Sequence, residues 1–258
     1  MLGLGVGFYR LGGDTKPDIW STTTALGLDG NSDYVELPSG FKSNFDTGTG
    51  SVSLWINLVE NDGGTSQTAF RIETDSNNFL LLLYHKHYTE WRASIKTGGT
   101  IRTATYDIPG SSNNDGSGYD DGWQHFVITF HIADGAYSIR LYRNGSLVQN
   151  TNGSSGQSDW SGEPASAYIG AQGGTSAFID GYIDQLAFYN VELTAANITA
   201  MYNSGVPRDL TTIHTNYSPA NLYAYYQFEN NALDSSLNGY HATLNGTASV
   251  NNKVQPDD

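Results

Sequence analysis

Two groups of aromatic side chains have the chemistry of a sugar-binding surface. Exposed aromatic rings stack on the apolar face of a sugar, and neighbouring polar groups fix its orientation. His87, Tyr88, Trp91 and Arg92 fall in or beside one short connection between two predicted strands, and Trp160 stands in a Gly- and Ser-rich segment. Core or cross-strand packing is the alternative for Trp91. We expect Trp160 to be available to a ligand, because no core demands a ring in that loop.

A carboxylate in a predicted strand is a candidate metal ligand. If residues 182–188 form a regular strand, Asp184 lies on the same face as Leu186 and Phe188. A carboxylate on a core-facing row needs either hydrogen-bond donors or a cation. Oxygen ligands without cysteine suit Ca²⁺. The alternative is that backbone N–H groups satisfy Asp184 and no metal binds.

The residues needed for catalysis do not occur in a recognisable pattern. Cleavage of a polysaccharide uses two carboxylates roughly 5–9.5 Å apart. The chain has seven Glu, no two of them within five positions of each other. On a regular strand the Cα atoms of Asp180 and Asp184 are about 13 Å apart. We therefore expect a non-enzymatic protein, and a glycosidase assembled from scattered residues is the open alternative.

The composition excludes several classes of protein. The 258 residues include 26 acidic and 12 basic side chains, for a formal net charge of −14. A non-specific nucleic-acid binder needs a basic face, so we expect no nucleic-acid partner. No run of 18 apolar residues occurs, so membrane insertion is not expected. The chain has no cysteine, which excludes disulfides and thiolate metal sites.

The elements that must position these residues are short strands separated by turn signals. Residues 51–58 alternate, with Val52, Leu54 and Ile56 on one face, which predicts a half-buried strand. Asn144-Gly145 predicts a type I′ hairpin turn between residues 137–143 and 146–149. One helix is predicted over residues 195–203, after Thr194 as its N-cap. At least ten strands and one short helix predict an all-β, two-sheet antiparallel sandwich.

Three segments together resemble the laminin-G-like branch of the concanavalin A-like jelly rolls. Residues 28–37 resemble the opening strand pair of that family, with Asp29-Gly30 followed by Asp33-Tyr34-Val35. Residues 123–127 and 141–145 form the second match, and residues 178–190 with the following short helix form the third. The order and spacing of these segments across residues 25–205 imply a jelly-roll fold.

One departure from the family pattern implies a circular permutation. The family usually begins with a Tyr-Trp-x-Phe-Asp/Glu strand followed by an Asp-Ser-Ser-Gly-Asn-Gly loop, but residues 225–229 and 234–239 match these at the other end of the chain. The last segment would then complete the sheet that the first normally starts. A truncated second copy is the alternative, and it would leave Tyr225, Tyr226 and Phe228 without a core.

The resemblance also implies a calcium site. Many jelly rolls of this kind hold Ca²⁺ with the aspartate of the strand that corresponds to residues 182–188, a glycine carbonyl and an acid of the first strand. Carried over to this sequence, these are Asp184, Gly30 and Glu229, with Asp29 as a further candidate.

The sequence divides into an arm and a domain. Residues 1–20 are rich in Gly and apolar residues and are predicted to anchor the protein to a neighbour, and residues 21–258 to form one laminin-G-like domain. The start lacks the basic region of a secretory leader, although such domains normally act outside cells. We therefore predict a bacteriophage virion surface protein of the capsid-decoration or fibre type. It would contact other virion proteins through residues 1–20, form a homo-oligomer and bind host or environmental glycans. A free-standing bacterial carbohydrate-binding module or lectin is the alternative.

Overall fold

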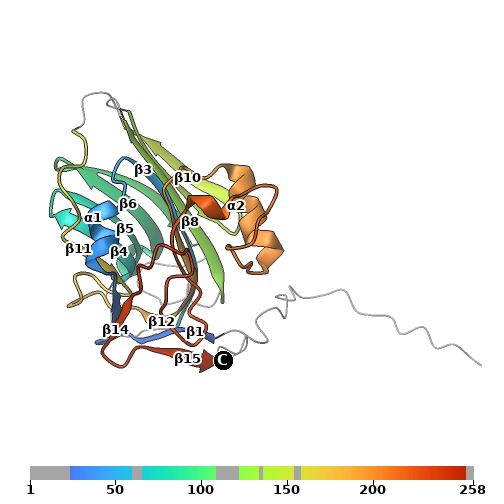
Figure 1. Ribbon diagram of the computed structural model, residues 1–258. Coiled ribbons are helices and arrows are strands. Elements are labelled where there is room, and N and C mark those ends of the chain that lie inside the picture. Colours follow the sequence, from blue (N-terminus) through green and yellow to red (C-terminus); the bar gives the residue numbers. More distant parts are fainter. Residues whose placement is uncertain (1–23, 60–65, 109–121, 134–135, 154–157, 254–258) are drawn as a thin grey trace, which may run out of the picture.

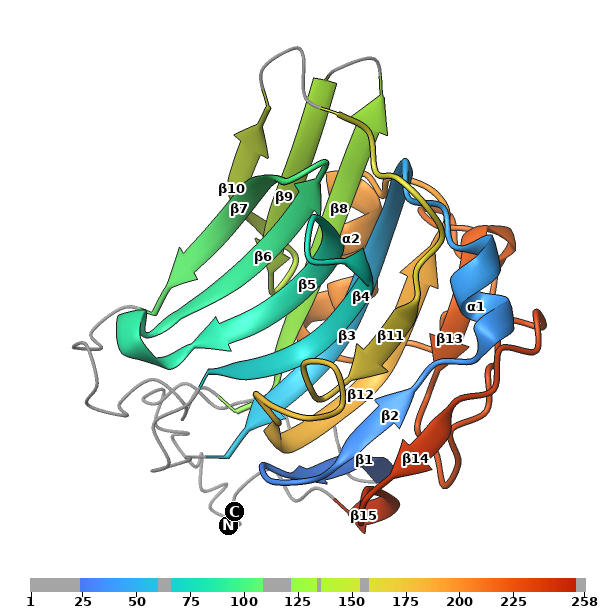
Figure 2. The same ribbon diagram turned by 90° about the vertical axis from the view of Figure 1, so that its left-hand side faces the viewer.

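The protein is a sandwich of two antiparallel sheets, as the sequence predicts (Figures 1 and 2). This computed structural model describes residues 24–59, 66–108, 122–133, 136–153 and 158–253. The predicted arm, residues 1–20, lies outside the described residues. None of the described helices is long and apolar enough to cross a membrane.

The first sheet has eight strands, of which seven follow one another in the order β10-β9-β8-β3-β12-β1-β15 and β13 pairs with β12. Their bounds are β1 (Thr24–Asp29), β3 (Thr49–Leu58), β8 (Gln124–Ala133), β9 (Ala136–Arg143), β10 (Ser146–Asn152), β12 (Asp180–Tyr189), β13 (Leu222–Tyr226) and β15 (Ser249–Lys253).

The second sheet has seven strands in the order β14-β2-β11-β4-β5-β6-β7. Their bounds are β2 (Tyr34–Glu36), β4 (Gln67–Asp75), β5 (Asn78–His85), β6 (Glu90–Thr97), β7 (Thr100–Asp107), β11 (Ser166–Ile169) and β14 (Thr243–Asn245). Figure 2 shows this sheet in front of the first.

Strand alternation places the main core between the sheets. On β3 the side chains of Val52, Leu54 and Ile56 belong to the inter-sheet core, as the sequence predicts. Trp55 lies on the opposite face, where it contacts the ring of His125. Removal of these aliphatic side chains from water is the main driving force for the packing of the two sheets.

The predicted hairpin between β9 and β10 is present. Asn144 has φ 49° and Gly145 has φ 79°, the positive values that a type I′ turn requires at both central positions. A Cβ atom at Gly145 would lie 3.0 Å from the side chain of Tyr202, so the turn also approaches its neighbour closely. Glycine is required here for both reasons.

The predicted helix is α2 (Ala195–Tyr202), and it forms for the reason that the sequence indicates. Thr194 Oγ1 accepts a hydrogen bond from the backbone N–H of Asn197, whose side chain in turn reaches the backbone N–H of Thr194. Asn203 ends the helix with φ 49°. A second helix, α1 (Ser39–Asn44), was not predicted, and its buried Phe41 holds it against the core although it has no side-chain cap. Single 3₁₀ turns occur at η1 (Lys86–Tyr88), η2 (Asn203–Gly205) and η3 (Pro219–Asn221).

The C-terminal segment completes both sheets. β13 pairs with β12, β15 with β1 and β14 with β2. Tyr225, Tyr226 and Phe228 are almost completely buried, so a truncated second copy without a core is wrong. The carboxylate of Asp234 accepts hydrogen bonds from the backbone N–H groups of Tyr225, Ser236 and Tyr240, and so fixes the loop that follows β13.

A further layer covers the outward face of the first sheet. Figure 1 shows α2 on the side of this sheet that faces away from the second one. Between them lies a second apolar cluster: Val127, Tyr142, Ala187, Tyr189, Leu193, Ile198, Met201, Leu210, Tyr217, Leu222 and Tyr225. The outer face of this sheet is therefore buried in part.

Candidate carbohydrate-binding site

Three of the five predicted sugar-binding residues form a surface cluster beside η1. Tyr88 is 51% exposed, and the rings of His85 and His87 lie 4.8 Å from its ring. The guanidinium carbon of Arg92 lies 4.9 Å from the centre of the Tyr88 ring. Arg92 also pairs with Glu90. A cation thus occupies one face of Tyr88, and a sugar could stack only on the part of the ring that remains exposed.

The other two predicted residues are buried. Trp91 is 2% exposed and packs on Tyr84 and Phe126, with ring centroids 5.7 and 4.7 Å away. Trp160 is 8% exposed, and its Nε1 donates a hydrogen bond to Thr74 Oγ1 at 2.8 Å. The expectation that no core demands Trp160 is therefore wrong, because its loop turns back and inserts the ring into the inter-sheet core.

Asp184 does not lie on the face that regular alternation predicts. β12 has a bulge between Asp184 and Ala187 relative to β3, and Gln185 there has φ 49°. A bulge shifts the alternation by one residue, so Ile183 and Leu186 both belong to the inter-sheet core. Asp184, opposite Trp55, faces outward beneath the outer layer.

Asp184 is nevertheless sealed from solvent. Its Oδ1 accepts the backbone N–H of Gln185 at 2.9 Å, whereas its Oδ2 has no hydrogen-bond partner. Burial raises the pKa of Asp184 well above its usual range, and the charge of Glu229 raises it further. Glu229 Oε2 accepts hydrogen bonds from the backbone N–H and Oγ1 of Thr24, both at 3.3 Å. The structure thus brings Asp184 and Glu229 together.

The other two predicted calcium ligands lie elsewhere. Asp29 is opposite Asp180 in the β1–β12 pair, four residues along β12 from Asp184, which corresponds to about 13 Å. Gly30 follows Asp29 at the end of β1. The four residues therefore do not converge on one ion, and no group of three or more His, Cys, Asp or Glu in the described part of the chain is arranged to hold a metal. Calcium binding stays a prediction, which an unchanged melting temperature after chelation would contradict.

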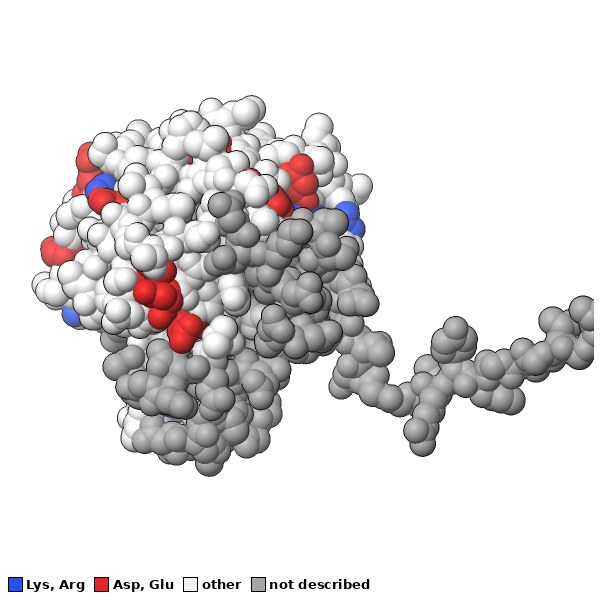
Figure 3. Space-filling model, turned by 90° about the horizontal axis from the view of Figure 1, so that it is seen from below, with Lys and Arg blue, Asp and Glu red and all other residues white. Residues whose placement is uncertain are grey.

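Acidic side chains meet at the lower end of the sandwich. A cavity of about 290 Å³ is lined by Asp29, Asp33 and Asp180 among others. Burial raises the pKa of Asp180, and the charge of Asp29 raises it further. Backbone N–H groups of residues 31–33 bind the carboxylate of Asp29, and Thr247 binds that of Asp33. Figure 3 shows several acidic side chains on the described surface of this underside. The chain itself thus meets the hydrogen-bonding needs of the Asp29 and Asp33 carboxylates in large part.

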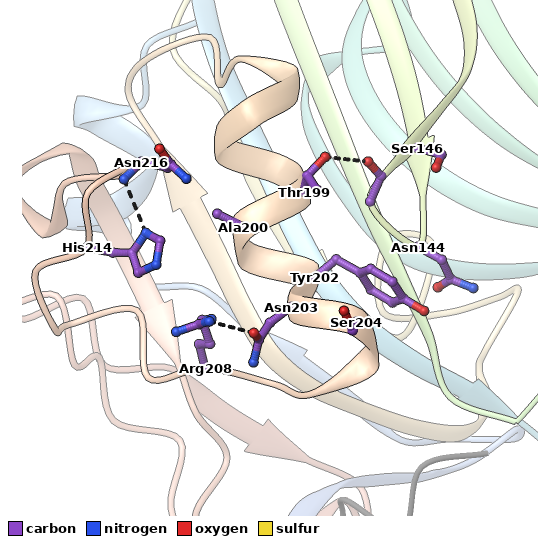
Figure 4. A pocket seen from close by; sticks show the side chains of 11 residues that line it. Asn144, Ser146, Thr199, Ala200, Tyr202, Asn203, Ser204, Arg208, His214 and Asn216 are labelled. Carbon is purple, nitrogen blue, oxygen red and sulfur yellow. Dashed lines mark hydrogen bonds between the residues drawn. The ribbon is translucent and has the colours of Figure 1, made fainter. Parts of the chain in front are cut away.

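A further candidate binding site is a polar pocket beside α2, which we call the α2 pocket. It has a volume of about 490 Å³ and lies between the β9–β10 turn, α2 and the segment after it. Its lining includes the side chains of Asn144, Ser146, Thr199, Tyr202, Asn203, Arg208, His214 and Asn216 (Figure 4). None of the described residues that line it is Asp or Glu.

Hydrogen bonds within the protein hold the walls of the α2 pocket. Asn144 Oδ1 accepts the backbone N–H of His125 at 2.9 Å, and Thr199 Oγ1 donates to the carbonyl of Gly145 at 3.0 Å. Arg208 Nη2 donates to Asn203 Oδ1. The α2 pocket is therefore formed before a ligand arrives, which reduces the entropy cost of binding.

Stacked rings support the floor of the α2 pocket. The ring of Tyr202 lies 5.8 Å from Trp55 and 6.1 Å from His125, with nearly parallel planes. His125 is 1% exposed, and burial lowers its pKa to about 3. Its Nε2 is 2.8 Å from Ser53 Oγ. This serine–histidine pair has the atoms of a nucleophile and a base, but both residues are buried and no substrate reaches them.

The sequence did not single out the residues of the α2 pocket. Arg208 and His214 lie in an irregular segment more than 60 positions from Asn144 along the chain. Asn144-Gly145 was recognised only as a turn. This turn and the helix predicted over residues 195–203 are the sequence signals that point to this region.

Comparison with solved structures finds proteins of similar fold. A putative carbohydrate binding protein from Bacteroides ovatus matches with 15% identity and a TM-score of 0.52, over 88% of this chain and 58% of that one. The botulinum neurotoxin serotype D binding domain matches with 17% identity and a TM-score of 0.49, over 68% of this chain and 42% of that one. The chain thus spans well under two thirds of either protein. At these identities the likeness shows the fold alone.

The chain was also compared with curated proteins and with protein-family models. No curated protein matches the chain. A family model described as the concanavalin A-like lectin/glucanases superfamily (Laminin_G_3) matches residues 29–199. Because this match spans well over half of the chain, the protein belongs to the laminin-G-like family of the concanavalin A-like lectin/glucanase superfamily.

Proposed function

We propose that this protein binds carbohydrate, without catalysis, in the α2 pocket. The observation that carries the proposal is a preformed concavity whose walls are amide, hydroxyl and guanidinium groups beside the ring of Tyr202. Sugars are recognised by such directional polar groups together with an aromatic surface. The volume of about 490 Å³ is within the usual range for small ligands.

A binding function fits the geometry better than a catalytic one. Asp180 and Asp184 lie four residues apart on one strand, about 13 Å, which exceeds the separation that glycoside hydrolysis uses. Ser53 and His125 are sealed beneath the outer layer. Neither pair is available to a glycan in the α2 pocket, and none of the described residues that line this pocket is Asp or Glu.

Filling the α2 pocket tests this function. Ser146 is exposed at the start of β10, so Ser146→Trp places a large ring in the α2 pocket without disturbing the core. Asn150→Trp adds the same ring to an exposed position of the same strand that does not line the α2 pocket, and serves as the control. On a broad glycan panel, we expect the parent protein and Asn150→Trp to bind and Ser146→Trp to lose binding. Equal binding by all three proteins would place the glycan elsewhere.

The virion-surface role is a finer proposal. It depends on the Gly-rich, apolar residues 1–20 as an anchor to other virion proteins, in a homo-oligomer. A bacterial lectin is the second candidate. Deletion of residues 1–20 distinguishes the two candidates. If the protein is a virion-surface protein, the deletion prevents its incorporation into particles. Sugar binding is expected to be unchanged by the deletion in both cases. A truncated protein that still joins particles would contradict the anchoring role.

A further inference from the structure

Hydrogen-bond donors are concentrated at one end of the α2 pocket. Arg208 Nη2 donates to Asn203 Oδ1, and Arg208 Nε is buried without a hydrogen-bond partner in the described part of the chain, which leaves Nη1 as the donor group of Arg208 for a ligand. Asn203 uses both groups of its amide, because its Nδ2 donates to the carbonyl of Val206. The guanidinium is thus held by a neutral side chain, and no carboxylate among the described residues forms an ion pair with it.

A histidine adds a second donor at the same end. The Nδ1 atom of His214 accepts the backbone N–H of Asn216 at 3.2 Å, which leaves the proton on Nε2. The ring of His214 stacks on that of Tyr217, with centroids 4.8 Å apart and planes 10° from parallel. This stacking fixes the direction in which the ring presents its donor.

The opposite end also offers a donor. Asn144 Oδ1 is occupied by the backbone N–H of His125, so the Nδ2 group of Asn144 is the part of its amide left for a ligand. Figure 4 shows Arg208 and His214 on one side of α2, and Asn144 and Tyr202 on the other. A ligand that satisfies the α2 pocket must therefore be rich in acceptors.

The charge of the α2 pocket is opposite to that of the chain. The protein carries a formal net charge of −14, yet none of the described lining residues is acidic and one is Arg. Asp209 is the nearest acid in sequence, but its Oδ1 accepts from the backbone N–H and the hydroxyl of Thr211, and it does not line the α2 pocket. Acidic ligands are repelled by most of the surface, so a cationic pocket is their favourable place to bind.

We propose that the α2 pocket selects acidic saccharides, whose carboxylate binds at Arg208 and His214 while a neutral ring lies towards Tyr202 and Asn144. This inference rests on the proposed carbohydrate-binding function and names the class of sugar. A guanidinium N–H donates a charge-assisted hydrogen bond to a carboxylate oxygen, and such bonds are stronger than neutral ones. Uronic acids and sialic acids both present this group.

Matched pairs of sugars test the selectivity. The full chain is titrated calorimetrically with a glucuronic-acid disaccharide and its carboxyl-reduced neutral counterpart, and with a sialylated trisaccharide and its neutral parent. We expect at least one acidic sugar to bind about tenfold or more tightly than its neutral partner, since one charge-assisted hydrogen bond contributes on that order. The pair that shows the difference identifies the source of the carboxylate.

Two substitutions connect the selectivity to the α2 pocket. Arg208→Gln removes the charge and is expected to reduce the acidic-to-neutral ratio to near one, and His214→Gln to reduce it in part. Lys96→Gln removes the same charge from the second sheet, where Lys96 donates to the carbonyl of Ser76, and is expected to leave the ratio unchanged. Circular dichroism and the melting temperature verify that each variant folds. If Arg208→Gln does not fold, the ratio measured for His214→Gln decides the test.

The outcomes separate the inference from the function on which it rests. Equal binding of acidic and neutral sugars, with loss of both in Ser146→Trp, overturns the acid selectivity and supports the carbohydrate-binding function. An acid preference that survives Arg208→Gln and His214→Gln overturns the role of these two residues. Binding of none of these sugars, and of none on the panel, overturns both proposals.

Discussion

Replacement of His125 by Phe is expected to remove a specific pH dependence of stability. His125 is buried under the α2 pocket, and its Nε2 contacts Ser53 Oγ while its Nδ1 has no partner. An imidazolium would need acceptors at both nitrogens, so the site favours the neutral ring, and burial lowers its pKa to about 3. The unfolded chain, in contrast, binds the proton near pH 6.5.

The magnitude follows from this difference between the two states. Between pH 6.5 and 3 the unfolded state binds one more proton at His125 than the folded state, so stability falls as the pH falls. From pH 7 to pH 5 the loss is about 2 kcal/mol. Asp184 acts in the opposite direction, because its raised pKa lets the folded state hold a proton that the unfolded state has lost. The change of wild-type stability with pH alone therefore does not measure the contribution of His125.

A difference between variants isolates the contribution of His125. His125→Phe keeps a ring between Trp55 and Tyr202 but leaves the Ser53 hydroxyl without this partner, which costs about 1–3 kcal/mol at every pH. Asp184 is two strands away, about 10 Å, so its contribution is nearly the same in both proteins.

Urea unfolding at pH 5, 6, 7 and 8, followed by tryptophan fluorescence, measures the difference. We expect His125→Phe to be less stable than the parent at pH 7 and the gap to narrow by about 2 kcal/mol at pH 5. His87→Phe, at an exposed position, controls for the loss of a histidine. A gap that stays constant within about 0.5 kcal/mol between pH 7 and 5 would refute the burial of a neutral imidazole at this site.

Four further substitutions test the structure. Trp160→Ala is expected to reduce the free energy of unfolding by about 3–5 kcal/mol, whereas Tyr88→Ala changes it by no more than about 0.5 kcal/mol; denaturant titration distinguishes a core ring from a surface ring. Gly145→Ala is expected to cost about 1–3 kcal/mol, because φ is 79° and the new Cβ meets Tyr202; equal urea midpoints for the two proteins would contradict this. Asp234→Ala leaves three backbone N–H groups without their acceptor, and we expect a lower melting temperature.

Local patterns in the sequence predict many of the strands and the β9–β10 turn, but not β7, β14 or β15. Alternation on β3 identifies its buried face because side chains of a strand point to opposite sides at every residue. Asn144-Gly145 identifies its hairpin because few residue pairs accept positive φ at both positions. The C-terminal strand was recognised from its aromatic residues, which bury where the permuted order predicts.

Features that depend on distant contacts were not predictable. The face of Asp184 was assigned wrongly because the bulge at Gln185, a residue with no intrinsic preference for positive φ, shifts the alternation. Trp160 was expected at the surface because its loop is polar, but its partner Thr74 lies 86 residues earlier in the chain. Neither the bulge at Gln185 nor the hydrogen bond between Trp160 and Thr74 leaves a signal in the neighbouring sequence.

The outer layer explains why the candidate site lies beside α2. The first sheet has apolar side chains on both faces, and the outward ones, such as Val127 and Tyr189, require a cover that α2 and the segment after it provide. That cover cannot close over the β9–β10 turn, where Gly145 already contacts Tyr202, so a polar concavity remains at its border. The same contacts that stabilise the layer hold the walls of the α2 pocket. A substitution that loosens α2, such as loss of the Thr194 cap, should therefore weaken sugar binding and lower stability together.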